Sequence, residues 1–205
     1  MEPDVKLRIL IAAKQLFAEQ GYDGTTIRQI CEKANANISL ISYYFGGKEK
    51  VFQSIFESFF SGTKLNQMDR EIKFSDPLDE FEFIIDQIMS FNFEDTELSY
   101  IINQELLMDS PRCEIVLSYV QPVWIKMEEI LEKGKSEGIF NYSSLANTSL
   151  VIKGICLSYK NYHKLQTQTQ ESAKDYESIK KTAMDFILNG LNVGKQMHGK
   201  LSHGT

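Results

Sequence analysis

The sequence predicts an all-α protein. Helix-type spacing of apolar residues runs along almost the whole chain of 205 residues, and the alternating patterns typical of strands are hard to find. Proline, which interrupts helices, occurs at only four positions. The apolar share of 42% is ordinary for a globular protein with a buried core. We therefore expect about nine helices, arranged as a short N-terminal domain and a larger helical domain.

The first predicted helix runs from Val5 to Gln20. Its apolar residues fall at spacings of three and four and form one face: Ile9, Ala13, Leu16 and Phe17. Gly21 follows, at the usual position of a left-handed C-terminal cap.

The second predicted helix begins after Gly24, with Thr25 as its N-cap. Its buried stripe comprises Ile27, Ile30, Cys31 and Ala34. It ends near Asn35, because asparagine tolerates the positive φ of a tight turn.

A third, very short helix is expected from Ile38 to Phe45, capped by Asn37 and ended by two glycines. Lys48 then opens a longer helix, whose apolar residues are Val51, Phe52, Ile55, Phe56 and Phe59. Two short helices joined by a turn of three or four residues form a helix-turn-helix, here at about residues 26–45.

The remaining helices are predicted from start signals and periodicity. Asp76-Pro77 is a strong helix start, since aspartate caps and proline suits the first helical position. The expected helices run from Pro77, over Asp95–Met108, from Pro111 to about Gly138 with a bend at Pro122, over Ser143–Leu165 and over Glu171–Val193. The polar tail, Gly194 to Thr205, is expected to be disordered.

Composition excludes several classes of protein. No stretch of about 18 apolar residues could span a membrane, and the acidic N-terminus lacks the layout of a signal peptide, so a cytoplasmic location is expected. The three cysteines are odd in number and far apart, which predicts neither disulfides nor a zinc site but small buried side chains. No metal site, cofactor loop or catalytic pair is recognisable.

The charge is unevenly distributed. Residues 1–52 carry seven basic and six acidic side chains, a balance of +1, whereas the whole chain carries −6. We call residues 1–52 the head and the remaining residues the body. A near-neutral head on an acidic body fits a protein of which only the head approaches phosphates.

One segment is specific enough to indicate a function. It contains Gly21-Tyr22-Asp23-Gly24-Thr25-Thr26, then Ala34-Asn35-Ala36-Asn37, then Tyr43-Tyr44-Phe45-Gly46-Gly47-Lys48-Glu49. With the preceding first helix, it resembles the DNA-binding head of TetR family regulators over about the first 60 residues. The sequence departs from the family at Asn35, where glycine is usual, and in a recognition helix that has no lysine or arginine.

The resemblance implies how the chain is organised. We expect a DNA-binding domain at 3–63, a helical ligand-sensing and dimerisation domain at 64–194, and a tail at 195–205. The implied function is that of a repressor that binds a palindromic operator as a homodimer and is released by a small-molecule effector. The last two long helices are the expected dimer surface, where the small Gly154 and Gly190 would allow close helix approach.

Ten residues are candidates for DNA contact: Thr25, Thr26, Arg28, Asn37, Ser39, Leu40, Ser42, Tyr43, Tyr44 and Lys48. Ile38, Ile41 and Phe45 recur at helical spacing and are expected to face inward, which leaves the tyrosines outside. The resemblance implies that Tyr43 and Lys48 contact phosphates.

The other contacts follow from the residue types. The two threonines lie at a helix N-terminus, which attracts anions. Hydrogen bonds to bases are expected from Asn37, Ser39 or Ser42, and Leu40 is expected to contact an apolar group such as a thymine methyl. For these residues, purely structural roles stay open as alternatives to DNA contact: the tyrosines as core residues, Thr25 as a helix cap alone, and Lys48 as an ordinary surface lysine.

A ligand pocket among the middle helices is implied by the resemblance alone. Tyr100, Asn103, Gln104 and Trp124 are candidates because they put polar tips on apolar helices. Two rival functions stay open at this point. One is a regulator that acts through protein partners without a small ligand, and the other is an all-α binding protein or enzyme with a relic head.

Overall fold

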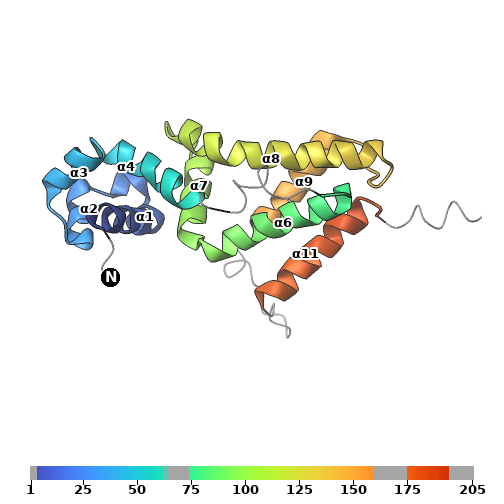
Figure 1. Cartoon of the computed structure of the whole chain (residues 1–205), viewed down its shortest axis with the longest axis horizontal. Coiled ribbons are helices and arrows are strands. Elements are labelled where there is room, and N and C mark those ends of the chain that lie inside the picture. Colours follow the sequence, from blue (N-terminus) through green and yellow to red (C-terminus); the bar gives the residue numbers. More distant parts are fainter. Residues whose placement is uncertain (1–3, 62, 64–73, 159–174, 194–205) are drawn as a thin grey trace, which may run out of the picture. The chain divides into compact units, whose positions relative to one another are not determined.

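The computed structural model of the chain describes residues 4–61, 63, 74–158 and 175–193. In these ranges it contains nine α-helices, one π-helix and no strand, which confirms the all-α prediction (Figure 1). The chain forms two compact units, one of residues 1–69 with 95–122 and one of residues 70–94 with 123–205. The predicted tail Gly194–Thr205 lies outside the described residues. No helix within the described ranges is both long and apolar enough to cross a membrane.

The first unit joins the N-terminal helices to a later part of the chain. It contains α1 (Val5–Gly24), α2 (Ile27–Ala34), α3 (Ile38–Tyr44), α4 (Lys48–Ile55), the π-helix η1 (Phe56–Phe60), α7 (Thr96–Leu107) and the start of α8 (Cys113–Ser136). Lys14 of α1 makes an ion pair of 2.9 Å with Asp95, the N-cap of α7. The expected domain boundary near residue 63 follows sequence order, whereas this compact unit also draws in residues 95–122.

The first two helices differ from the prediction where they meet. Gly21 has a φ of +77°, as expected of a glycine at a helix end, but the helix resumes for one more turn to Gly24. The extra turn moves the start of α2 by one residue, so that Thr26 and not Thr25 is its N-cap. The prediction of Thr25 as the cap is therefore wrong.

The fourth helix changes its hydrogen-bond pattern at Phe56. The α-helical spacing predicts that Phe59 continues the buried face, but Phe60 is 2% exposed and Phe59 is partly exposed. A π-helical turn holds one more residue than an α-helical turn, so the buried face passes to the next residue. Phe60 then packs edge-on against Tyr119 of α8, with ring centres 5.9 Å apart.

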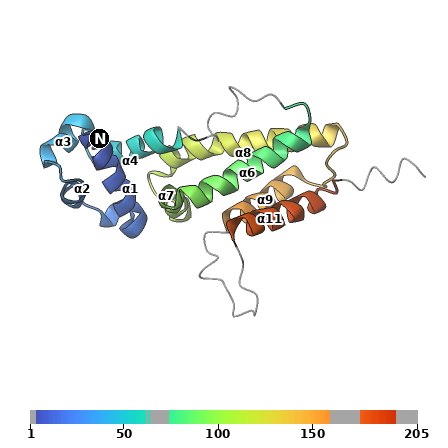
Figure 2. The ribbon, with the colours of Figure 1, turned by 60° about the horizontal axis from the view of Figure 1, so that its bottom comes forward.

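The second unit contains α6 (Pro77–Glu94), the rest of α8, α9 (Leu145–Ser158) and α11 (Tyr176–Gly190). The start of α6 at Pro77 is confirmed, with Asp76 accepting a hydrogen bond from the Leu78 amide. α6, α9 and α11 run side by side in Figure 2. Phe81, Ile84 and Ile88 of α6 are buried, and the ring centres of Phe81 and Phe140 are 5.3 Å apart.

Two of the three cysteines are buried, as predicted. Cys31 and Cys156 are enclosed, and Cys113 is partly exposed. Burial raises the pKa of the Cys156 thiol to about 12, so this side chain stays protonated at neutral pH.

Candidate nucleic-acid interface

The helix-turn-helix consists of α2, a three-residue turn and α3. Asn35 has a φ of +47°, the left-handed conformation expected of it, and its amide bonds back to the last turn of α2. Asn37 caps α3, because its side-chain oxygen accepts a hydrogen bond from the Ser39 amide. The turn is thus fixed at both ends by asparagine, which positions α3 without a glycine.

α3 has a buried side and an exposed side. Ile41 and Phe45 are buried, at 1% and 8% exposure, and fix the helix to its neighbours. Tyr43 is 79% exposed and Tyr44 38%, so the prediction that both tyrosines lie outside is confirmed. Their rings touch edge-on, with centres 4.9 Å apart.

The predicted inward orientation of Ile38 is wrong. Ile38 is 56% exposed, although its spacing from Ile41 and Phe45 matches the buried face. It is the first residue of the helix, and periodicity alone cannot tell where the neighbouring helices cease to cover that face. Leu40, the expected apolar contact, is only partly exposed, whereas Ser39 and Ser42 are exposed.

The two threonines at the start of α2 have different roles. Thr26 is exposed and forms a capping box, in which it accepts from the Gln29 amide while its own amide donates to the Gln29 side chain at 2.8 Å. Thr25 is 1% exposed, and its hydroxyl donates to the Gly21 carbonyl at 2.8 Å. The structure therefore places the Thr25 side chain in the interior, away from any phosphate.

Arg28 lies on the exposed side of α2. Its side chain is 83% exposed, and Nε forms an ion pair of 2.9 Å with Glu32 one helical turn away. Such exposed pairs contribute little to stability, and the guanidinium has four further N–H groups. Arg28 is therefore accessible to a phosphate or a base edge.

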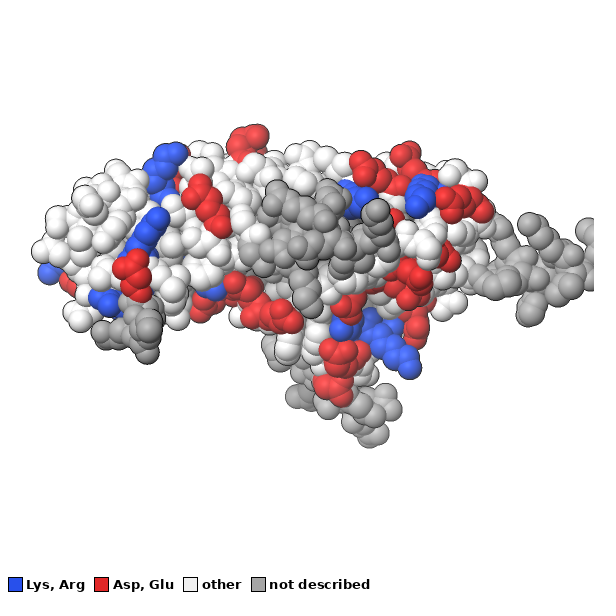
Figure 3. Space-filling model, viewed as in Figure 1, with Lys and Arg blue, Asp and Glu red and all other residues white. Residues whose placement is uncertain are grey.

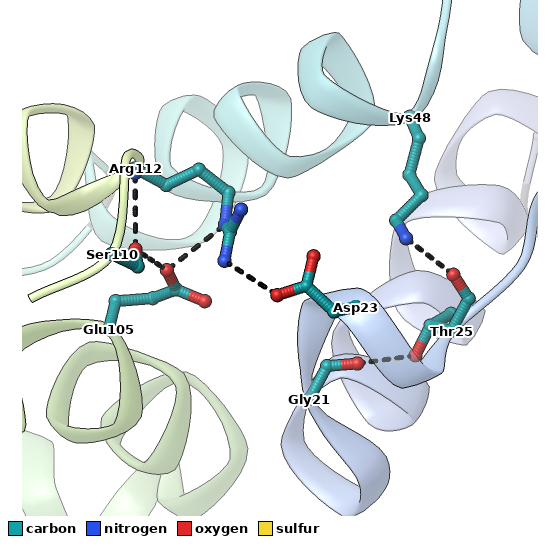
Figure 4. A network of polar contacts seen from close by, with 7 residues as sticks. All are labelled: Gly21, Asp23, Thr25, Lys48, Glu105, Ser110 and Arg112. Atoms are coloured by element: carbon teal, nitrogen blue, oxygen red, sulfur yellow. Dashed lines mark hydrogen bonds and ion pairs between the residues drawn. The ribbon is translucent and has the colours of Figure 1, made fainter. Parts of the chain in front are cut away.

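Lys48, the first residue of α4, is held in position by contacts with Thr25 and Tyr22. Its ammonium donates to the Thr25 carbonyl at 2.6 Å (Figure 4). It also lies 4.1 Å from the centre of the Tyr22 ring. Burial lowers the pKa of Lys48, and the Asp23 carboxylate opposes that shift. Since an ammonium has three N–H groups, Lys48 still has donors for a phosphate, from a fixed position.

A second cation lies against the same tyrosine ring. The Arg112 guanidinium, from the turn between α7 and α8, is 4.0 Å from the centre of the Tyr22 ring and 3.5 Å from Asp23. Its Nε also pairs with Glu105 of α7 at 3.0 Å. Burial is the main cause of the raised pKa of Tyr22, and the nearby Arg112 partly offsets it.

Glu105 and Ser110 complete the polar contacts around Arg112. The Glu105 side chain is 6% exposed and the Arg112 side chain 12%, so the pair is largely removed from water. The Ser110 hydroxyl donates to the same Glu105 oxygen and accepts from the Arg112 amide (Figure 4). We call Tyr22, Asp23, Lys48, Glu105, Ser110 and Arg112 the Tyr22 cluster.

Sequence reasoning missed most of the Tyr22 cluster. Of its residues, only Lys48 is a predicted DNA contact, and Tyr22 belongs to the segment Gly21–Thr26 that resembles the family. Arg112 lies 64 positions beyond Lys48 in the chain, and a single arginine after Pro111 gives no local signal. Only the packing of α1 on α7 brings these positions together.

Charged side chains are sparse over the N-terminal helices on the face drawn in Figure 3. The α1–α4 region shows isolated basic and acidic groups on a largely uncharged surface. This agrees with the balance of +1 for residues 1–52. Basic side chains are thus few in the N-terminal helices, and Arg28 and Lys48 are two of them.

The four candidate ligand residues do not all belong to one unit. Tyr100, Asn103 and Gln104 lie on α7 in the first unit, and Trp124 lies on α8 in the second. Asn103 donates to the Ser99 carbonyl of its own helix at 2.9 Å, and the Lys153 ammonium is 5.7 Å from the Trp124 ring. Their role in ligand binding stays a prediction.

Comparison with known proteins relates the N-terminal helices to a family of bacterial regulators. Residues 9–55 match the family described as "Bacterial regulatory proteins, tetR family". The chain is 24% identical over 160 residues to the probable HTH-type transcriptional regulator YttP of Bacillus subtilis, covering 77% of each chain. It is 26% identical over 164 residues to the HTH-type transcriptional repressor NicS of Pseudomonas putida, covering 78% of this chain and 77% of NicS.

Solved structures share the fold. HlyIIR, a hemolysin II transcriptional regulator, superposes with a TM-score of 0.66 at 24% identity, covering 87% of this chain and 96% of HlyIIR. A putative fatty acid metabolism regulator of Clostridium perfringens superposes with a TM-score of 0.73 at 18% identity, covering 89% and 97%. The family match over residues 9–55 and the similarity to curated HTH-type regulators along most of the chain support a TetR family transcriptional regulator, and the solved structures show that the fold is shared.

Proposed function

We propose that the chain is a repressor that binds a roughly palindromic operator as a homodimer and is released by a small-molecule effector. The observation that carries the DNA-binding part is the exposed side of α3, whose opposite side is anchored by Ile41 and Phe45. The major groove of DNA admits one helix, and a short helix supported from behind can present its outer residues to base edges. The curated relative NicS is itself named a repressor.

Within this proposal the contacts divide by type. Tyr43, Lys48 and Arg28 bind phosphates and fix the register, together with Thr26 at the start of α2. Asn37, Ser39 and Ser42 contact base edges, and Tyr44 supports Tyr43 through its edge-on ring contact. Thr25 contributes through its backbone, since its carbonyl holds Lys48 at 2.6 Å.

The proposed dimer surface is the outer side of α9 and α11. Leu150, Val151 and Phe186 are 70%, 60% and 72% exposed there, which is unusual for large apolar side chains on one surface. A groove of about 230 Å³ runs between the two helices, lined by Val151, Ile155, Phe186 and Gly190 among others. An added Cβ at Gly154 or Gly190 would meet no atom within 4 Å, so both glycines face open space.

The dimer surface is tested by Phe186→Glu. Because Phe186 is 72% exposed, a charge there leaves the folded protomer intact but opposes apolar association. We expect sedimentation to show a monomer and the affinity for a palindromic operator to fall, with an unchanged circular dichroism spectrum. A stable Phe186→Glu dimer would contradict the assignment.

The effector and the location remain inferences. Trp124 is the only tryptophan of the chain, so titration with candidate metabolites can be followed by its fluorescence. An effector acts as a releaser only if it binds the DNA-incompetent arrangement more tightly. We place the protein in the cytoplasm, where its operator would be, and assign it no enzyme activity.

Selection of DNA from a random duplex pool at near-physiological salt tests the proposed function. We expect recovery of a two-fold symmetric site, because a two-fold dimer presents α3 twice. Sequence-blind binding that only follows salt would contradict the operator-reading role. DNA binding that ignores every tested metabolite would favour the rival in which a protein partner replaces the small ligand.

A further inference from the structure

The exposed side of α3 has an apolar edge at Ile38, which the spacing of apolar residues does not predict. Successive residues of a helix are about 100° apart, so Ile38, Ser42, Ser39 and Tyr43 follow one another within an arc of about 140°. All four are exposed, and Ile38 and Tyr43 are the large side chains at the two edges of this arc, at 56% and 79%. Ile38 is therefore the apolar residue that α3 presents to a ligand, in place of the partly exposed Leu40.

The neighbouring polar side chain has a fixed hydrogen-bonding direction. The Asn37 Oδ1 atom accepts from the Ser39 backbone amide at 3.0 Å and from the Ser39 hydroxyl at 2.9 Å. Since an amide N–H can only donate, the Asn37 atom that faces it must be the oxygen. Asn37 therefore offers its Nδ2 hydrogens to a ligand. The single hydroxyl hydrogen of Ser39 is already donated to Asn37. At this end of α3 the side chain next to Ile38 is a donor.

A methyl-binding group beside a donor matches one base better than the other three. In the major groove, thymine presents a C5-methyl group next to the O4 acceptor. Cytosine presents a donor, adenine an acceptor with a donor, and guanine two acceptors, and none of these three carries a methyl group. We propose that Ile38 and Asn37 read a thymine in each half-site, Ile38 by packing on the C5-methyl and Asn37 by donating from Nδ2 to O4.

This inference rests on the proposed function, namely that α3 enters the major groove of an operator. It adds that the sequence preference near the start of α3 is for thymine and that Ile38 is a specificity-determining residue. It also supplies apolar readout in a recognition helix that lacks lysine and arginine, where the commonest guanine contact is missing.

The test substitutes single bases in the operator recovered from the random pool. Uracil in place of each thymine removes the methyl group and keeps O4. For the unaltered protein we expect one thymine per half-site at which uracil weakens binding about 4-fold, the value of one buried methyl group. With Ile38→Ala, thymine and uracil should bind equally at that position, whereas Leu40→Ala should keep the difference.

The role of Asn37 is tested with a base that keeps the methyl group and loses the O4 acceptor. 5-Methylcytosine keeps the methyl group but replaces the O4 acceptor with a donor. It should weaken binding of the unaltered protein at the same position, and less so for Asn37→Ser, which keeps a good N-cap but loses the amide donor. Both variants should unfold at nearly the same temperature as the unaltered protein, because Ile38 and Asn37 are exposed.

The possible failures can be told apart. If a symmetric operator is recovered but Ile38→Ala retains the full uracil effect, or no thymine is sensitive to its methyl group, the thymine inference is overturned and the proposed function stands. If no specific operator exists, both are overturned.

Discussion

The head of this regulator contains two groups of aromatic and polar residues that are built in opposite ways. Around Tyr22, the Lys48 and Arg112 cations lie 4.1 Å and 4.0 Å from the ring centre, and Arg112 also pairs with Asp23 and Glu105. On α3, Tyr43 is 79% exposed and touches only its neighbour Tyr44 among the aromatic contacts of the described residues. Tyr22 therefore holds the first unit together, whereas Tyr43 is available to bind DNA.

The largest effect should separate these two tyrosines. Tyr22→Ala removes a ring that packs on Phe17 and Phe52 at 5.3 Å and 5.5 Å, and should cost about 3 kcal/mol of unfolding free energy. Tyr43→Ala should change it by less than about 0.5 kcal/mol, as for most surface substitutions. Denaturant unfolding of both variants measures the difference, and equal costs would contradict the division of roles.

Arg112→Ala should give the next largest effect. It leaves the Glu105 carboxylate, 6% exposed, without its arginine, and loss of one partner of a buried pair costs about 3 kcal/mol. The double variant Glu105→Leu/Arg112→Met should recover much of that loss, because apolar residues of similar size often replace a buried pair well. If the double variant is no more stable than Arg112→Ala, desolvation of Glu105 is not the cause.

The adjacent threonines offer a matched pair at the start of α2. Thr26→Ala removes the cap and half of the capping box, and should cost about 1 kcal/mol. Thr25→Val keeps the shape of the buried side chain and removes only its hydrogen bond to Gly21, which contributes a similar or smaller amount. Thr26→Ala should also weaken DNA binding, since Thr26 is exposed and Thr25 is not; a gel-shift titration that finds the reverse order would contradict this assignment.

The smallest effect is expected in the second unit and depends on pH. Hydrogen bonds from Lys153 and Ser149 hold the pKa of Glu128 below its ordinary value of 4.5. A lowered carboxyl pKa stabilises the fold above that value, and the contribution is lost as the pH falls through the folded-state pKa. Lys153→Met should therefore cost less than about 1 kcal/mol at pH 7 and still less in acid. Lys133→Met, at an exposed position of α8, serves as the control.

Local sequence signals predicted local structure well. Asp76-Pro77, Asn35 and Asn37 behave as their side-chain chemistry requires, and the two tyrosines lie outside as the periodicity of α3 indicates. The predictions were wrong where packing against neighbouring elements determines which residues are buried or where a helix begins. Ile38 has the spacing of a buried residue, but no neighbouring helix among the described residues covers it. One extra turn after Gly21 moves the N-cap of α2 from Thr25 to Thr26. Arg112 could not be found at all, because its partners Tyr22 and Asp23 are distant in sequence.

The most direct test of the account is the operator affinity of the double variant Tyr43→Ala/Lys48→Met, compared with the unaltered protein over a range of salt concentrations. Methionine keeps the length of Lys48 over the Tyr22 ring and removes the charge. We predict weaker binding to all DNA sequences alike, with a salt dependence reduced by about one counterion per half-site. Unchanged affinity in a folded double variant would contradict the claim that this surface of the head binds DNA.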